Sequence, residues 1–160
     1  MKKLKSIIVV LAFISVTACG FTPMLKDADF SDIKIKTISY TGSSGLTYFL
    51  KNNINLNGNK AFNDGYNVKI SINESAVSHT KSTAGLTTEE KVTVNITFDI
   101  LDKNNKKIGQ DSISGSRIVS VTNNVSTDEE TKRIEKENII TNLIQKLTFS
   151  IRAKILSNQQ

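Results

Sequence analysis

Cysteine and histidine are the two residue types that most often bind zinc or form a nucleophile with its base, and each occurs once in this sequence. The only cysteine is Cys19 and the only histidine is His79. A zinc site needs three or four protein ligands, and a nucleophile needs a base beside it, so neither residue has the partners that such chemistry requires. We therefore expect no catalytic centre, no metal and no cofactor. His79, in "SAVSHTKS", is predicted to lie in a solvated loop.

Two further stretches have the residue types of a ligand site but not the pattern. Asp27, Asp29 and Asp32 are crowded together, but they lack the glycine and the closing glutamate of a calcium loop. "GSSG", residues 42–45, lacks the lysine and the spacing of a phosphate-binding loop. The acidic residues are predicted to belong to a solvated tether, and the glycine-serine stretch to a turn and a helix cap.

Residues 1–18 have the order of a secretory signal. Three lysines come first, an apolar run over 7–16 follows, and small residues end at Ala18. A membrane-spanning helix needs about 20 apolar residues, so this run is too short to be a permanent span. It is predicted to be a leader that is cut between Ala18 and Cys19.

The segment "VTAC", which ends at Cys19, resembles the lipobox of bacterial lipoproteins. The resemblance implies that a diacylglyceryl group alkylates the Cys19 thiol and that the new N-terminal amine is acylated. Anchoring by two or more acyl chains is stable, and lipidation also explains a thiol that has no disulfide partner. The alternative is an ordinary cysteine after a conventional cleavage site, either free or paired between chains.

The net charge of the chain and the residue that follows Cys19 both indicate where in the cell the protein is located. The full chain has a net charge of +6, and loss of the lysines in the leader leaves 18 basic and 15 acidic residues, or +3. A mildly basic exported domain meets anionic lipid headgroups and glycolipid phosphates rather than nucleic acid. In enteric bacteria an Asp after the lipidated cysteine tends to retain lipoproteins in the inner membrane, and Gly20 stands there instead. We expect a lipid anchor on the periplasmic side of the outer membrane.

The mature chain opens with a strand and a helix. "DIKIKTISY", residues 32–40, alternates apolar and polar residues, and a bulge near Thr37 would bring its two apolar phases into register. Ser43 or Ser44 is predicted to cap a helix whose apolar residues recur at helical spacing as far as Ile54.

Three strands and a long helix follow. Residues 66–73 and 91–100 alternate with period two, and "DKNNKK", residues 102–107, predicts a hairpin turn into a weaker strand over 108–121. Ser126 or Thr127 is predicted to cap a helix with an apolar stripe from Ile140 to Ile155.

The order of these elements predicts an α+β fold in which two helices pack on one face of a four-stranded, mostly antiparallel sheet. The expected division of the chain is a signal peptide over 1–18, a lipidated tether over 19–31, one domain over 32–157 and a frayed end over 158–160.

The sheet face without helices is either simply solvated or a binding surface. Its outward positions carry many Asn, Ser and Thr residues. A basic patch for glycolipid phosphates is predicted there from Lys69, Lys81, Lys91 and Arg117, although Arg117 shares the phase of apolar residues unless a bulge intervenes.

With the lipobox, "CGFTPML" resembles the "CGF-x-P-L" start of the LptE family of lipopolysaccharide-assembly lipoproteins, in its alphaproteobacterial type. The resemblance covers the mature chain in element order and spacing. It implies a non-catalytic protein that plugs the LptD-type outer-membrane β-barrel and contacts lipopolysaccharide. The arginine that relatives often have between the central strands is absent.

Three functions can be compared, and two of them are compatible with the sequence. The first is an outer-membrane lipoprotein that plugs the LptD-type barrel, assisting its assembly and the delivery of lipopolysaccharide. The alternative is a lipid-anchored accessory of an ABC-type lipid-transport system, for which the same anchor and fold would serve. A lipid-anchored enzyme is the least favoured, for want of catalytic residues.

Overall fold

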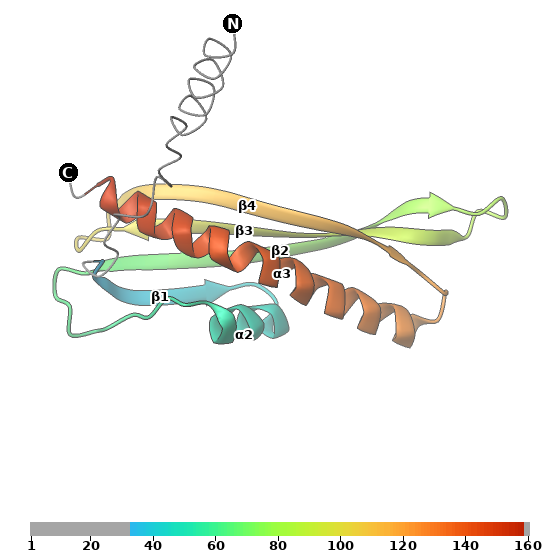
Figure 1. Ribbon diagram of the computed structural model, residues 1–160, viewed down its shortest axis with the longest axis horizontal. Coiled ribbons are helices and arrows are strands. Elements are labelled where there is room, and N and C mark those ends of the chain that lie inside the picture. The colour runs from blue at the N-terminus through green and yellow to red at the C-terminus, as the bar shows by residue number, and fades with distance from the viewer. Residues whose placement is uncertain (1–32, 159–160) are drawn as a thin grey trace, which may run out of the picture. The chain divides into compact units, whose positions relative to one another are not determined.

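The computed structural model describes residues 33–158, and the leader, Cys19 and the tether lie outside the described residues. Figure 1 shows two helices lying across one face of a four-stranded sheet. The predicted α+β fold is confirmed. The elements in chain order are β1 (Ile35–Thr41), α2 (Ser44–Asn53), β2 (Tyr66–Lys81), β3 (Thr87–Leu101), β4 (Lys107–Ser120) and α3 (Val125–Leu156).

The strands lie in the order β1-β2-β3-β4. β1 runs parallel to β2 because helix α2 connects them, whereas the β2–β3 and β3–β4 pairs are antiparallel hairpins. The register of β1 shifts between Ile35 and Thr37, which confirms the predicted bulge. Ile38 and Tyr40 consequently pack against the same core as Ile35.

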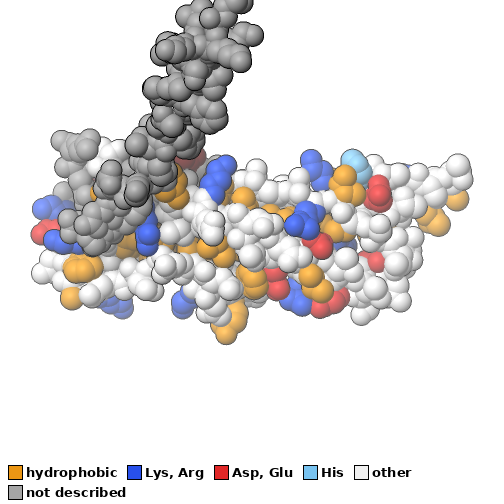
Figure 2. Space-filling view, in the orientation of Figure 1, with side chains coloured by type: hydrophobic (Ala, Val, Ile, Leu, Met, Phe, Trp, Pro, Cys, Tyr) orange, Lys and Arg blue, Asp and Glu red, His pale blue; other side chains and the backbone are white. Residues whose placement is uncertain are grey.

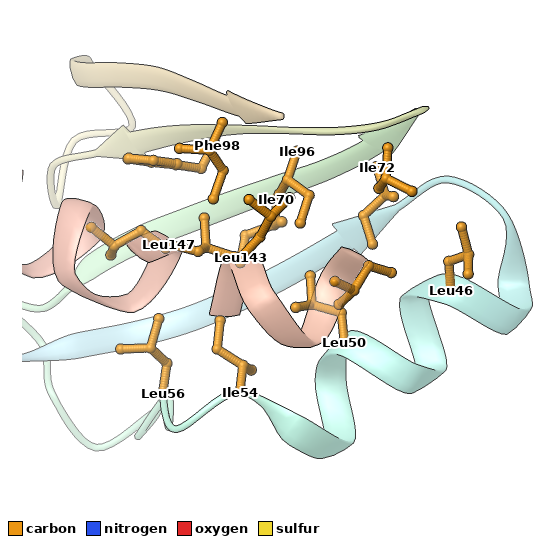
Figure 3. Close-up of a cluster of buried hydrophobic side chains, with 14 of the residues drawn as sticks. Leu46, Leu50, Ile54, Leu56, Ile70, Ile72, Ile96, Phe98, Leu143 and Leu147 are labelled. Carbon is orange, nitrogen blue, oxygen red and sulfur yellow. The ribbon is translucent and has the colours of Figure 1, made fainter. Parts of the chain in front are cut away.

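The core lies between the sheet and the two helices (Figure 3). Every second residue of β3 from Val92 to Ile100 is buried, which is the alternation of a strand with one covered face. The helices contribute leucines and isoleucines at three- and four-residue spacing, such as Leu46 and Leu50 of α2. Both helices therefore cover one face of the sheet, and no other element of residues 33–158 covers the opposite face. On the side of the molecule that Figure 2 shows, charged side chains of both signs lie among apolar ones.

Polar side chains and a left-handed residue close the β3–β4 turn. Asp102 Oδ1 accepts the backbone N–H groups of Asn104 and Lys106, each at 2.8 Å. Asn105 has a φ of 61°, a conformation that asparagine tolerates. The predicted hairpin is confirmed, and the β2–β3 turn likewise has Gly85 at a φ of 81°.

Helix α3 begins earlier than expected. Its N-cap is Asn124, whose side chain accepts the N–H of Thr127 at 3.3 Å, so Ser126 and Thr127 lie within the helix. Asn123 has a φ of 60°, which turns the chain into the helix immediately after β4. Ser43 and Ser44 are the two predicted caps of α2, and the structure has Ser43 at the N-cap position. Its side chain makes no capping hydrogen bond.

β2 is longer than the expected strand and includes His79. Residues 73–81 are exposed, so they show no apolar alternation, yet they pair with β3 as far as Lys81. His79 is exposed as expected but lies in a strand, not a loop. Within residues 33–158, no helix combines the length and the apolar composition needed to cross a bilayer.

Candidate functional site

The open face of the sheet, on the side away from the helices, carries small polar side chains. They occupy the positions that alternate with the buried residues of each strand, and the strand register brings them into one surface. We call the central part of this surface the polar face. It consists of Ser39, Thr41, Ser71, Asn73, Ser75, Thr93, Asn95, Thr97, Ser112, Ser114 and Ser116.

The polar face has no charged residue among its members, and hydrogen bonds link some of its side chains. Ser112 Oγ donates to Asn95 Oδ1 at 2.7 Å. Hydroxyl and amide groups can both donate and accept hydrogen bonds. The surface can therefore pair with many polar partners, and its short side chains allow another surface to come close.

Charges lie beside the polar face, not within it. Lys69 is opposite Asp99 in the register, and Lys107 Nζ lies 2.8 Å from Asp99 Oδ1. Towards the other end of the sheet, Lys91 is flanked by the exposed apolar residues Val77 and Ile118, which are its neighbours on β2 and β4.

The structure does not bring the four predicted phosphate-binding residues together. Lys69 and Lys91 are both on the open side of the sheet, but their positions are eight residues apart along the register, or about 26 Å at the usual rise of a strand. Lys81 is at the hairpin end, opposite Thr87.

Arg117 lies on the helix side of the sheet. It is opposite the buried Val92, and no bulge in β4 reverses its phase. Its guanidinium lies 3.4 Å from the carboxylate of Glu135 on α3. A single basic patch of all four residues is therefore not present.

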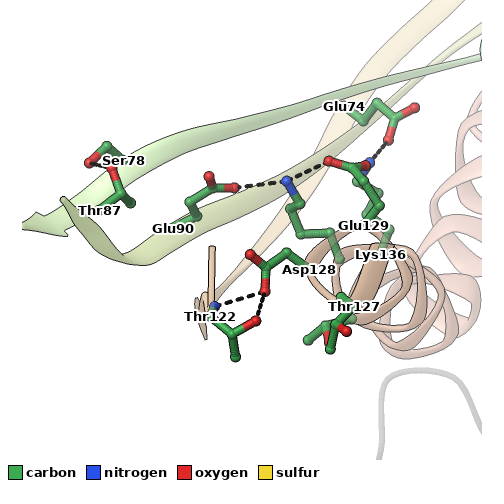
Figure 4. A network of polar contacts seen from close by, with 11 residues as sticks. Glu74, Ser78, Thr87, Glu90, Thr122, Thr127, Asp128, Glu129 and Lys136 are labelled. Atoms are coloured by element: carbon green, nitrogen blue, oxygen red, sulfur yellow. Dashed lines mark hydrogen bonds and ion pairs between the residues drawn. The ribbon is translucent and has the colours of Figure 1, made fainter. Parts of the chain in front are cut away.

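Ion pairs attach the first half of α3 to the sheet (Figure 4). Lys132 Nζ lies 3.2 Å from Glu90 on β3 and 2.7 Å from Glu129, and its side chain is only 13% exposed. The hydrogen bond that Lys132 donates to Glu129, together with Glu90, raises the pKa of Lys132 despite its partial burial. Lys136 makes a similar ion pair with Glu74 of β2.

Asp128 is buried, with 8% of its surface exposed, and it is the one buried residue of α3 between Val125 and Glu137. Its carboxylate accepts the backbone N–H of Thr122 at 2.8 Å and the Thr122 hydroxyl at 2.9 Å. The backbone hydrogen bond is the main cause that lowers the pKa of Asp128. This carboxylate joins the end of the sheet to the first turn of α3. Sequence reasoning did not identify it or the ion pairs.

A cleft of about 640 Å³ lies between the N-terminal ends of the two helices, beside β2. Leu46 and Val125 supply apolar walls, and Glu74 lies where the cleft meets the sheet. The charged residues that line it include Arg133 and Lys136, which pair with neighbouring glutamates. The cleft thus combines an apolar wall with charges that are already neutralised.

The described residues do not form an evident centre for a metal. Residues 33–158 contain no group of three or more His, Cys, Asp or Glu side chains in a metal-binding arrangement. Cys19, the predicted lipidation site, and Ala18, the predicted cleavage site, lie outside the described residues.

No family model matches the sequence, and no curated protein matches it. Solved structures do match. A minor lipoprotein from Acinetobacter baumannii is 22% identical with a TM-score of 0.53, over 74% of this chain and 93% of that one. Rare lipoprotein B from Shewanella oneidensis is 12% identical with a TM-score of 0.55, over 78% and 100% of the two chains.

A lipoprotein B from Nitrosomonas europaea is similar to the same extent, with 13% identity, a TM-score of 0.55, and 79% and 88% of the two chains covered. At these identities the comparison concerns the fold alone. The domain described here therefore has a fold that is shared with these bacterial lipoproteins.

Proposed function

We propose that this protein is an outer-membrane lipoprotein that binds and plugs an LptD-type β-barrel, and so assists barrel assembly and the delivery of lipopolysaccharide to the cell surface. The lipobox ending at Cys19 and the adjoining "CGFTPML" support the anchor and the family resemblance. The fold shared with rare and minor lipoproteins agrees with both.

The polar face is the observation that carries the barrel partnership. The interior of a large outer-membrane barrel is polar. A sheet surface of Ser, Thr and Asn residues can pack against such a wall and exchange its hydrogen bonds with water for hydrogen bonds with the partner. Because its centre is uncharged, docking there avoids the large desolvation penalty of burying ions.

Lys69 and Lys91 are the proposed contacts for lipopolysaccharide on this side of the sheet. Both are exposed, and an ammonium group beside a phosphate makes a strong, charge-assisted hydrogen bond. Since they lie about 26 Å apart along the strand register, they would contact separate phosphate groups. Lys81, at the hairpin end, would make a third separate contact, whereas Arg117 would have to leave Glu135 to contribute.

Photo-crosslinking in cells tests the partnership and the face together. A photoreactive residue would replace Ser116, which is exposed on the polar face, or Asn142, which is exposed on α3 and serves as the control. We expect crosslinks from position 116 to a single large β-barrel and few or none from position 142. Crosslinks from 116 only to inner-membrane transporter subunits would contradict the proposal and favour the ABC-type accessory. Barrel crosslinks from 142 alone would show that the polar face is not the contact.

A further inference from the structure

The second half of β2 is held by hydrogen bonds on one side only. β1 pairs with β2 as far as Thr41 and Ser71, and within residues 33–158 no other strand follows beside β2. From Asn73 to Lys81 every residue of β2 is exposed. This segment therefore has two exposed faces and a free edge, and the backbone hydrogen bonds that it makes to another strand are those of its ladder to β3.

The alternation of the strand identifies the backbone groups on this edge. The N–H of Tyr66 donates to Lys34 O, on the β1 side of β2. Since N–H and C=O groups of alternate residues point to the same side of a strand, those of Glu74, Ala76 and Ser78 also point away from β3. These residues form a ready template for another extended chain, and we call them the free edge of β2.

The opposite edge of the sheet, on β4, is better protected. Asp111 Oδ1 accepts the outward N–H of Ser112 at 2.8 Å, so one donor of that edge is already satisfied. β4 also carries charges at Lys107, Asp111 and Arg117, and charged side chains are a common means of preventing strand addition. On the free edge of β2 the one charged side chain, Glu74, is held by Lys136 of α3.

The cleft between the helices lies directly beside the free edge, because Glu74 belongs to both. β1 ends at Thr41, and a strand added to β2 would occupy the position beside β2 beyond that point. Every second side chain of the added strand would point to the helix side of the sheet, towards the cleft. Leu46 and Val125 supply apolar contacts there, and Val125 is 78% exposed. Because the charged residues of the cleft pair with one another, uncharged side chains fit best.

We infer that the free edge of β2 binds an extended segment of the barrel partner by strand addition, with small or apolar side chains of that segment entering the cleft. The inference rests on the proposed function and adds the mode of recognition. Ser75 and Val77, which alternate with the edge residues, lie on the open side of the sheet. A partner that covers the polar face therefore reaches the free edge as part of the same interface. Main-chain hydrogen bonds provide the affinity in this mode, and the pockets for alternate side chains provide the specificity.

A proline at position 76 tests the edge with little direct effect on the rest of the sheet. Ala76→Pro removes an N–H that points away from β3, so the β2–β3 ladder keeps its hydrogen bonds, and proline is tolerated at such edge positions. Ser120→Pro is the matched control, because the register places the Ser120 N–H on the outer edge of β4 and Ser120 is exposed and lies outside the polar face. Both full-length variants would be compared with wild type for thermal unfolding and for the amount of barrel copurified from membranes.

We expect Ala76→Pro to keep the fold and to lower barrel recovery by roughly fivefold to tenfold. That change corresponds to about 1–1.4 kcal/mol, the value of the one net hydrogen bond that is lost. Ser120→Pro should recover the barrel as wild type does. Hydrogen exchange of the wild-type complex is a second measurement that does not depend on the proline variant folding. The amides of Ala76 and Ser78 should exchange more slowly in the complex than in the free protein.

Equal recovery with Ala76→Pro and wild type, or unprotected amides at Ala76 and Ser78 in the complex, would overturn strand addition and leave the barrel partnership intact. Equal losses with both proline variants would show that the effect is not specific to this edge and would also overturn it. Failure of wild type to recover any barrel would instead reject the proposed function.

Discussion

Gly115 of β4 lies directly beneath Ile139 of α3, and a Cβ atom at Gly115 would lie 2.8 Å from Ile139 Cγ2. That distance is too short for two carbon atoms, and the branched side chain of isoleucine has few alternative rotamers. The glycine therefore allows the helix to approach the sheet closely at the point where the apolar half of α3 begins.

Gly115→Ala should destabilise the protein by about 1–3 kcal/mol, the usual cost of overpacking a core. Gly109→Ala is the matched control on the same strand, because its Cβ would meet its nearest neighbours at an ordinary 3.7 Å. Chemical denaturation of both variants measures the difference. Equal unfolding free energies for the two variants would show that α3 does not depend on the missing Cβ.

Asp128 should make stability depend on pH in the acid range. Its pKa is lower in the folded protein than the value of about 3.9 expected in the unfolded chain, chiefly because the backbone N–H of Thr122 donates to it. Such a carboxylate contributes stability above about pH 4, and the contribution is lost as the pH falls through the folded-state pKa. Asp128→Asn should therefore unfold more easily than wild type at pH 7, and the difference should shrink below about pH 4.

Thr122→Val separates the two hydrogen bonds of Asp128. This variant loses the hydroxyl donor but keeps the backbone N–H, so most of the pH dependence should remain. Melting temperatures measured between pH 3 and pH 7 would decide the matter. A constant difference between Asp128→Asn and wild type over that range would rule out the proposed role of this carboxylate.

Lys69→Gln and Lys91→Gln should each weaken binding to lipopolysaccharide while changing stability by no more than about 0.5 kcal/mol, as is usual for surface substitutions. Because the two residues are about 26 Å apart along the register, well beyond the Debye length of about 8 Å at physiological salt, their effects should add. Lys146→Gln, on the exposed side of α3, is the control for loss of one positive charge. Normal lipopolysaccharide binding by the double variant would reject both lysines as contacts.

Cys19→Ala should abolish labelling of the protein with a radioactive fatty acid and leave it unanchored or unprocessed, because Cys19 is the one thiol in the chain. A Ser15→Ala variant, altered within the leader and not at the thiol, should still be labelled. Continued acyl labelling of Cys19→Ala would refute the lipobox interpretation.

The sequence predicts those parts of the fold that depend on burial. The alternation from Val92 to Ile100 identifies β3 and its covered face, because each apolar residue there enters the core. The bulge near Thr37 could also be predicted, since Ile35 and Ile38 cannot otherwise face the same side. Two helices with apolar stripes must then cover the face to which these residues point.

The features that the sequence does not reveal depend on polar contacts between distant residues. The second half of β2 has no apolar alternation because it is exposed, so only its pairing with β3 identifies it as a strand. Asp128 and Thr122 meet because Asn123 turns the chain, and composition does not specify that turn. The ion pair between Arg117 and Glu135 also joins two different elements, so the sequence alone did not predict it.

Purification of the full-length, tagged protein from separated inner and outer membranes tests the central claim most directly. The expected result is one very large β-barrel of the LptD type, recovered with the protein from the outer-membrane fraction. Its recovery should fall in the Ala76→Pro variant and stay at the wild-type level in Ser120→Pro. Recovery of inner-membrane transporter subunits alone, with no barrel in either fraction, would contradict the proposed function.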